Sequence, residues 1–204
     1  MSYAQTPPHV DNYMIGKGIL SIAKITGGVT GTYADVGNCT KFEFQMTEET
    51  KEHFASRTST KEMDAEVVIM TGYTLDFSLD EVSVENMRMF LKGTEANKVI
   101  YANQNANQYY ALKFISDNPA GPNVKYEFWK CKLSPNGAFS LIGDDFTTMS
   151  FSGKGMSDRT GHSTSPFFTS TFQTTTSTTT TTTTTTAALS SQFNIRWVIT
   201  AHLE

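Results

Sequence analysis

The sequence predicts a mainly β domain with one α-helix, and three observations predict this fold class. Polar and apolar residues alternate over residues 62–79, which is the period of a β-strand with two different faces. Several other segments are rich in β-branched and aromatic residues and are bounded by Gly, Pro or Asn. Only residues 83–92 combine a helix cap with apolar residues at helical spacing.

Length and composition fit one domain with appendages. The chain has 204 residues, of which 38% are hydrophobic, enough to bury a core. Its formal net charge of −4 provides no basic footprint of the kind that holds nucleic acid through its phosphates, so we expect no tight DNA binding. The N-terminal residues have neither a cationic start nor an apolar run, so we expect no signal peptide, and no later segment predicts a membrane span.

The first part of the chain predicts an arm and two strands. Residues 1–12 are polar and contain two adjacent prolines, which favours an extended N-terminal arm. Residues 13–25 place isoleucines among glycines, as in a strand that bends. Residues 41–46 alternate as a half-buried strand, and residues 47–60, rich in charge and hydroxyls, predict a long exposed loop. The polar face of the second strand consists of Lys41, Glu43 and Gln45.

Residues 62–79 predict the longest strand, with the odd positions toward the core. A straight strand of this length would extend roughly 60 Å at about 3.4 Å per residue, so we expect a bend or break near Thr71 and Gly72. The even face carries an acidic stripe, which consists of Glu62, Asp64 and Glu66. Crowded carboxylates repel each other unless their face stays wet, so this face points into water or into a wet channel. An acidic channel wall would keep a polyanion from sticking, but an ordinary exposed sheet face explains the stripe equally well.

One helix is expected directly after this strand. Ser83 can cap its N-terminus, and Gly93 is expected to close it. The apolar stripe expected to face the core consists of Val84, Met87, Phe90 and Leu91.

The rest of the domain predicts short strands joined by turns. The strands are expected at residues 98–102, 108–116, 124–133, 138–142 and 146–152. Amide-, proline- and glycine-rich segments between them favour turns. Phe128 and Trp129 are adjacent and must face opposite sides of their strand, so both of its faces are expected to find cover.

Beyond Asp158 the composition changes. Residues 174–186 are all threonine except Ser177, and such a tract cannot form a core because every side chain is a small hydroxyl. A linker, a glycosylated stalk and a sequence error are all consistent with it. Residues 193–200 have strand character suited to pairing with an exposed edge. The expected parts are an extended arm at 1–12, a β domain at 13–158 and a C-terminal extension at 159–204.

Residue patterns for catalysis or metal binding do not occur. The sequence has no CxxC, GxGxxG, P-loop or GxSxG motif, so we expect that the protein is not an enzyme and binds neither a cofactor nor a metal. Cys39 and Cys131 are expected to be buried free thiols in a reducing compartment. Asp144 and Asp145 fit a turn better than a calcium site. The histidines, which we assign no function, are His9, His53, His162 and His202.

One alternative function rests on aromatic residues. Tyr126, Phe128 and Trp129 could stack a sugar or a base, although a strand so dense in aromatics favours the core. Together with a threonine-rich stalk, they would suit a secreted or surface carbohydrate-binding β-sandwich. The missing signal peptide argues against this alternative.

Three short segments carry a resemblance to a known family. They are YEFWKCKLSP at residues 126–135, SLIGDDF at 140–146 and SGKG at 152–155. With the order of the elements, they make residues 13–158 resemble the major tail tube protein of long-tailed (siphovirus-type) bacteriophages. The tube protein of type VI secretion systems is a relative of that family.

The resemblance implies a β-sandwich or barrel with a flanking helix, in a subunit that forms stacked homohexameric rings. Sheets from the subunits would merge into a tube that conducts DNA during ejection, which removes unpaired strand edges. The implied partners are other copies of the chain, the tail terminator, tape measure and distal tail proteins, and double-stranded DNA that passes without specific binding. The implied location is the virion tail, with assembly in the host cytoplasm and no membrane.

The resemblance also implies roles for particular residues. Candidates for the tube lumen are Lys41, Glu43, Gln45, Glu62, Asp64 and Glu66. Ring-to-ring contacts are expected from the loop at 47–60, the N-terminal arm and the segment after 158. The loop residues implied in those contacts are Glu48, Glu49, Lys51, Glu52, His53, Phe54 and Arg57.

Overall fold

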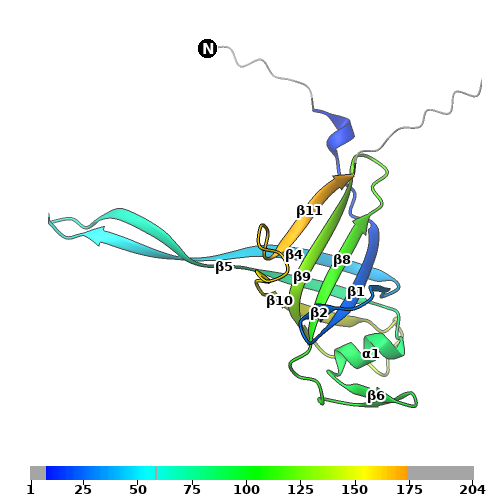
Figure 1. Ribbon diagram of the computed structural model, residues 1–204. Helices are drawn as coiled ribbons and strands as arrows, with labels where there is room; N and C mark the ends of the chain where they lie inside the picture. Colours follow the sequence, from blue (N-terminus) through cyan, green and yellow to red (C-terminus); the bar gives the residue numbers. More distant parts are fainter. Residues whose placement is uncertain (1–7, 58, 174–204) are drawn as a thin grey trace, which may run out of the picture.

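A computed structural model describes residues 8–57 and 59–173 of the chain (Figure 1). The fold is mainly β with antiparallel sheets and one short α-helix, which confirms the predicted fold class. The elements are a 3₁₀ turn η1 (Val10–Asn12), β1 (Gly18–Thr26), β2 (Val29–Thr30), β3 (Ala34–Asp35), β4 (Cys39–Ala55), β5 (Glu62–Leu79), α1 (Val84–Phe90), β6 (Thr94–Ala96), β7 (Val99–Tyr101), β8 (Tyr109–Ser116), β9 (Asn123–Pro135), β10 (Met149–Gly155) and β11 (Phe168–Gln173).

The main sheet has nine strands. Its order is β2-β1-β8-β9-β10-β5-β4, with β3 paired to β1 and β11 paired to β9. β9 has β8 along one edge, while its other edge pairs with β11 at residues 123–128 and with β10 at residues 131–135. β6 and β7 form a separate two-stranded sheet. β9 therefore pairs with three strands and is the central strand of the sheet.

The sheet curves strongly, so that β4 lies across the inner face of β9 and β11. The Phe44 ring on β4 lies 5.5 Å, centroid to centroid, from the Tyr126, Phe128 and Phe168 rings. The helix α1 covers one end of this layer, where the Phe90 ring meets Phe151 edge-on (Figure 1). The core is thus enclosed as in a sandwich, by one open curved sheet and a single helix.

Ser83 caps α1 as predicted, because its hydroxyl accepts a hydrogen bond from the Asn86 backbone N–H at 3.1 Å. The buried face of the helix differs from the predicted stripe: Met89 and Phe90 are buried, whereas Val84 and Leu91 are exposed. Asn86 is buried instead, and its Nδ2 donates to the backbone carbonyls of Val36 and Glu81. This bonding explains how a polar residue replaces an apolar one on the core face. Lys92 rather than Gly93 adopts the left-handed conformation after the helix, with φ 49°.

The structure corrects the prediction for residues 47–60. Residues 47–55 are not part of a loop, because they continue β4 to Ala55 and pair with β5. β5 has no break at Thr71 or Gly72 and runs from Glu62 to Leu79, but a β-bulge at Ile69 interrupts its regular pairing close to the position at which a bend or break was predicted. Charged and hydroxyl side chains are compatible with a strand when both of its faces meet water, and this is the environment of the segment.

Three other predicted features differ in the structure. Residues 138–142 form no strand but belong to a loop between β9 and β10. The sheet also extends past the expected boundary at Asp158, because β11 pairs with β9. At the N-terminus, η1 is a 3₁₀ turn rather than extended chain. The threonine-rich tract and the predicted strand at 193–200 lie outside the described residues.

Candidate assembly interface

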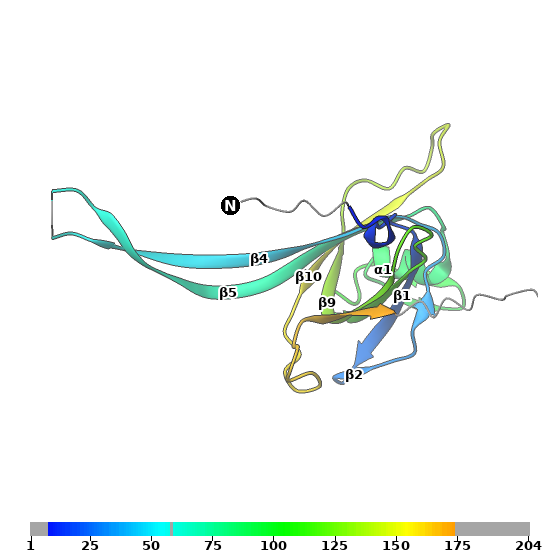
Figure 2. The ribbon, with the colours of Figure 1, turned by 90° about the horizontal axis from the view of Figure 1, so that it is seen from above.

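The outer halves of β4 and β5 leave the body together as a two-stranded arm, defined here as residues 47–71 (Figures 1 and 2). Within the body β5 pairs with β10 at residues 74–79, but along the arm its only described partner is β4. Residues 48–54 and 62–71 are all exposed. The arm therefore has both faces and both outer edges open within the described chain.

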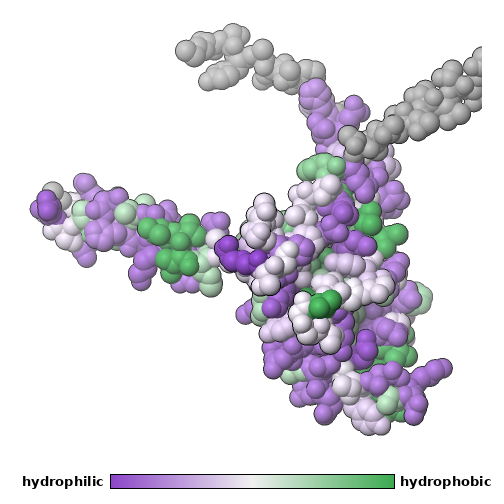
Figure 3. Space-filling view, in the orientation of Figure 1, coloured by the Kyte–Doolittle hydropathy of each residue, from purple (hydrophilic) through white to green (hydrophobic). Residues whose placement is uncertain are grey.

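The arm carries an apolar band, which consists of Val67, Val68, Ile69 and Met70. These side chains are between 49% and 60% exposed, and the space-filling view shows them as a hydrophobic cluster in mid-arm (Figure 3). An isolated two-stranded ribbon is at best marginally stable in water, and a contiguous exposed apolar patch typically marks an interaction site. The arm is therefore the strongest candidate for an interface in the described structure.

Two β-bulges change which residues of β5 share a face. Glu49 is opposite Met70 but Thr50 is opposite Val68, so Ile69 is an extra residue. Since directly opposed residues of an antiparallel pair lie on one face, each bulge shifts the alternation of β5 by one position.

The second bulge breaks up the predicted acidic stripe. Glu66 is opposite Glu52, whereas Glu62 is opposite Ala55, and these two partners are three residues apart on β4. Glu62 and Glu66 therefore lie on opposite faces of the arm. Asp64 is the extra residue of the bulge and contacts Nδ1 of His53. All three carboxylates are exposed, but they do not form the single face that the even spacing predicts.

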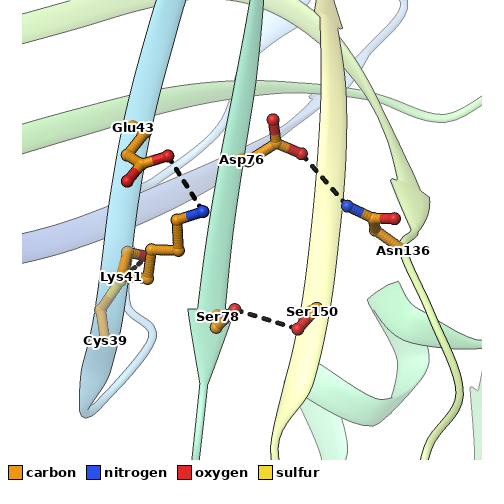
Figure 4. A network of polar contacts seen from close by, with 7 residues as sticks. All are labelled: Cys39, Lys41, Glu43, Asp76, Ser78, Asn136 and Ser150. Atoms are coloured by element: carbon orange, nitrogen blue, oxygen red, sulfur yellow. Dashed lines mark hydrogen bonds and ion pairs between the residues drawn. The ribbon is translucent and has the colours of Figure 1, made fainter.

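Lys41, Glu43 and Gln45, the other predicted lumen residues, do lie together on the outer face of the body. They are opposite Ser78, Asp76 and Thr74 of β5, which in turn are opposite Ser150, Ser152 and Lys154 of β10. Figure 4 shows the contacts of this polar face, which include Lys41 Nζ to a Glu43 carboxylate oxygen at 2.9 Å and the Ser78 and Ser150 hydroxyls at 3.0 Å. The Glu43 carboxylate raises the pKa of Lys41. The face is polar across three strands and carries both signs of charge.

The residues predicted for ring-to-ring contacts lie on the arm. Those from Glu48 to Phe54 are exposed positions of β4, and Arg57 is exposed beyond the end of that strand. The structure thus groups them on one projecting element, as a strand and not as the predicted loop.

A further exposed cluster lies on the loop at residues 136–148, which we name the apolar loop. Leu141, Ile142 and Phe146 are 84%, 95% and 96% exposed. The predicted strand at 138–142 treated two of these residues as sheet residues. Their neighbours Gly143, Asp144 and Asp145 were a signal against that interpretation, since such residues favour turns.

The open side of the sandwich holds a cavity of about 300 Å³ between β4 and the segment that leads into β1. Its apolar lining includes Met14, Phe42, Phe44, Phe114 and Tyr126. No described strand pairs with the outer edge of β4 beside it. This edge is a second place at which the sheet could be extended.

The aromatic platform of the alternative function is not exposed. Phe128 is fully buried, and the Trp129 ring stacks on the His162 ring at 3.6 Å with an interplanar angle of 7°. Trp129 Nε1 also donates to the Ser165 carbonyl at 2.8 Å. Both faces of this strand are covered at Phe128 and Trp129, as predicted, whereas Tyr126 lines the cavity and stays partly exposed.

In the described part of the chain, no three His, Cys, Asp or Glu side chains lie close enough together to hold a metal ion. Asp144 and Asp145 are exposed loop residues. Cys39 and Cys131 are free thiols, the first half-buried and the second buried, and burial raises the pKa of both. None of the helices in the described residues is long and apolar enough to cross a membrane.

Comparisons with known proteins show a structural similarity and a family. The fold is similar to a chain in the cryo-EM structure of the anti-feeding prophage baseplate, 6-fold symmetrised, at 8% identity and a TM-score of 0.43, covering 74% of this chain and 92% of that chain. No curated protein matches the sequence. A family model matches residues 13–100 and 94–171, which together span most of the chain. The chain therefore belongs to the family described as "Protein of unknown function UCP028589".

Proposed function

We propose that this chain is a virion structural protein, a tail tube subunit that self-assembles into stacked rings around a conduit for DNA. The observation that carries the proposal is the arm, an exposed two-stranded ribbon with an apolar band and open edges. The role requires no catalytic group. The partners in this role are other copies of the chain, with tail terminator, tape measure and distal tail proteins at the tube ends.

The arm supports self-assembly on energetic grounds. Each apolar side chain in the band is about half exposed in the single chain, and complete burial of a fully exposed side chain of this kind stabilises by roughly 1.5–3 kcal/mol. The backbone N–H and C=O groups along both outer edges also lack strand partners within the described residues. Association with other copies would satisfy both the apolar side chains and the strand edges.

The body supports a closed ring rather than an open aggregate. The outer edge of β4 and the cavity beside it leave the curved sheet unclosed on one side. Neighbouring copies that extend one another's sheets would close a barrel, which abolishes edges altogether. The sequence resemblance to tail tube proteins supports six copies per ring.

The polar face around Lys41, Glu43 and Asp76 suits the inner wall of such a ring. It is wet and carries charges of both signs, so it offers no basic surface that would hold the phosphates of passing DNA. The carboxylates of the arm lie on two different faces, so the arm presents no single acidic surface. The polar face of the body therefore suits the inner wall better than the arm does.

Electron microscopy of the purified full chain tests the proposal. We expect negative-stain images to show rings or tubes with a central hole. The matched variant replaces residues 49–70 by Asn-Gly, because Glu48 and Thr71 are directly opposed and a two-residue turn can join them. This variant should remain folded, with a β-type circular dichroism spectrum and a cooperative unfolding transition, but form no tubes. A full chain that remains a monomer over a range of salt and protein concentrations would refute the proposed function.

A further inference from the structure

We propose that the apolar band of the arm in one copy binds the apolar loop of another copy, with Lys51 beside Asp144 and Asp145. This inference rests on the proposed function and names the surface that receives the arm. It joins two clusters of exposed apolar side chains, one on each of two projecting elements.

The apolar loop is held in shape while its apolar side chains point outward. Its first residue, Asn136, donates its backbone N–H to the Ser150 carbonyl at 2.8 Å, and its Nδ2 reaches Asp76 at 3.3 Å. Near its other end, the Thr147 hydroxyl donates to the Ser140 carbonyl at 3.0 Å. Figure 2 shows the loop, in yellow-green, projecting from the body beside β9 and β10. A loop that is already held in one conformation loses little conformational entropy when it binds a partner.

The arm presents apolar side chains on both of its faces. Val67 is opposite Lys51 and Val68 is opposite Thr50, and consecutive residues of a strand point to opposite sides. A symmetric arm-to-arm contact would use the same face of both arms and leave the other face in water. A different surface must therefore cover one face, and the apolar loop is the most exposed apolar cluster on the body.

Charges beside the two apolar clusters are complementary. Lys51 shares a face with Val67, and Asp144 and Asp145 follow Ile142 closely in the loop. Within the part of the chain that the structure describes, no ion pair involves Lys51, Asp144 or Asp145. The lysine and the two carboxylates are thus available to set the register of an apolar contact.

The proposed contact is heterologous, because it joins two different surfaces. Each copy that uses its arm still offers its loop, and each copy that uses its loop still offers its arm. Such head-to-tail contacts propagate from copy to copy, which is the requirement for rings that stack into a tube.

Cysteine cross-linking tests the contact directly. Two full-length proteins are prepared in a Cys39→Ser background, one with Val67→Cys and one with Ile142→Cys; Cys131 is buried and stays. When the two are assembled together and oxidised, we expect a covalent dimer, since a disulfide requires Cα atoms within about 7 Å. The matched control pairs Ile142→Cys with Val29→Cys, an exposed apolar position on β2, and should give no dimer. A dimer of the Val67→Cys protein alone in equal yield would overturn the proposal in favour of an arm-to-arm contact.

A charge exchange tests the same contact without cysteines. We expect Lys51→Glu to reduce the pelleted mass of tubes about tenfold, and the Asp144→Lys/Asp145→Lys double variant to do the same, as for charges at a desolvated contact. Combination of all three substitutions should restore at least about half of the tube mass, which a merely misfolded variant would not do.

The outcomes separate the two proposals. Wild-type tubes without a mixed dimer and without rescue would overturn the arm-to-loop contact and leave the proposed function standing. A wild-type chain that never forms rings or tubes would overturn both.

Discussion

Phe128 lies at the centre of the core, and its replacement by alanine is a sharp test of the packing described above. Its ring is fully buried and meets the rings of Phe42, Phe44, Tyr73 and Phe168 at centroid distances between 5.2 and 5.9 Å. These rings come from β4, β5 and β11. Phe128→Ala therefore removes the group that links the layers of the curved sheet.

The expected cost follows from burial and cavity formation. Loss of a fully buried phenylalanine ring, with the cavity that it leaves, lowers the free energy of unfolding by about 3–5 kcal/mol. Neighbouring rings held in strands cannot collapse easily into the space, so we expect a value near about 4 kcal/mol. In a chain of this size that loss lowers the melting temperature by about 8–16 °C. Phe146→Ala is the matched control, because Phe146 is 96% exposed, and it should change the free energy by no more than about 0.5 kcal/mol.

Both substitutions are made in the variant in which Asn-Gly replaces residues 49–70. Urea unfolding followed by far-ultraviolet circular dichroism then measures their free energies of unfolding without a contribution from assembly. A loss below about 1.5 kcal/mol for Phe128→Ala would fall outside the range for a filled core site and would refute the packing argument. Equal losses for Phe128→Ala and Phe146→Ala would refute it as well.

Two further predictions concern a glycine and a thiol. Gly155→Ala should lower the free energy of unfolding by about 1–3 kcal/mol in urea titrations, because the new Cβ would lie 2.1 Å from the buried Tyr73 ring. Gly16→Ala, with nothing within 4 Å of its Cβ, is the control and should be nearly neutral. Burial raises the pKa of Cys131 above its ordinary value of 9.0, so the unfolded chain loses this proton first and the folded state is destabilised as pH rises above 9.0. The free energy of unfolding should fall there by up to about 1.4 kcal/mol per pH unit, and an unchanged slope in Cys131→Ala would contradict this origin.

The core-facing half of β5 could be predicted from the sequence because its environment is asymmetric. Tyr73, Leu75, Phe77 and Leu79 are buried on the face that the odd positions predict. Selection for a packed face leaves an alternating pattern, and the pattern is therefore readable. The capped helix was equally readable from Ser83, since a cap is a local interaction.

The arm could not be predicted, because alternation shows which face is less polar and does not show whether anything covers it. The same pattern continues through residues 62–71, where both faces are exposed. The bulges at Ile69 and Asp64 depend on the register with β4, a non-local property that no single segment carries. The acidic residues are therefore spaced as predicted, but the inference that they share one face was wrong.

The placement of β11 on the edge of β9 has a consequence for biosynthesis. Phe168 pairs with Phe128, forty residues earlier in the chain. At a synthesis rate of about 5–20 residues per second, the edge of β9 at residues 123–128 waits roughly 2–8 seconds for its partner. During that interval the nascent chain exposes an aromatic strand edge next to other nascent copies. The order of translation thus makes this protein most vulnerable to premature association just before its last described strand emerges from the ribosome.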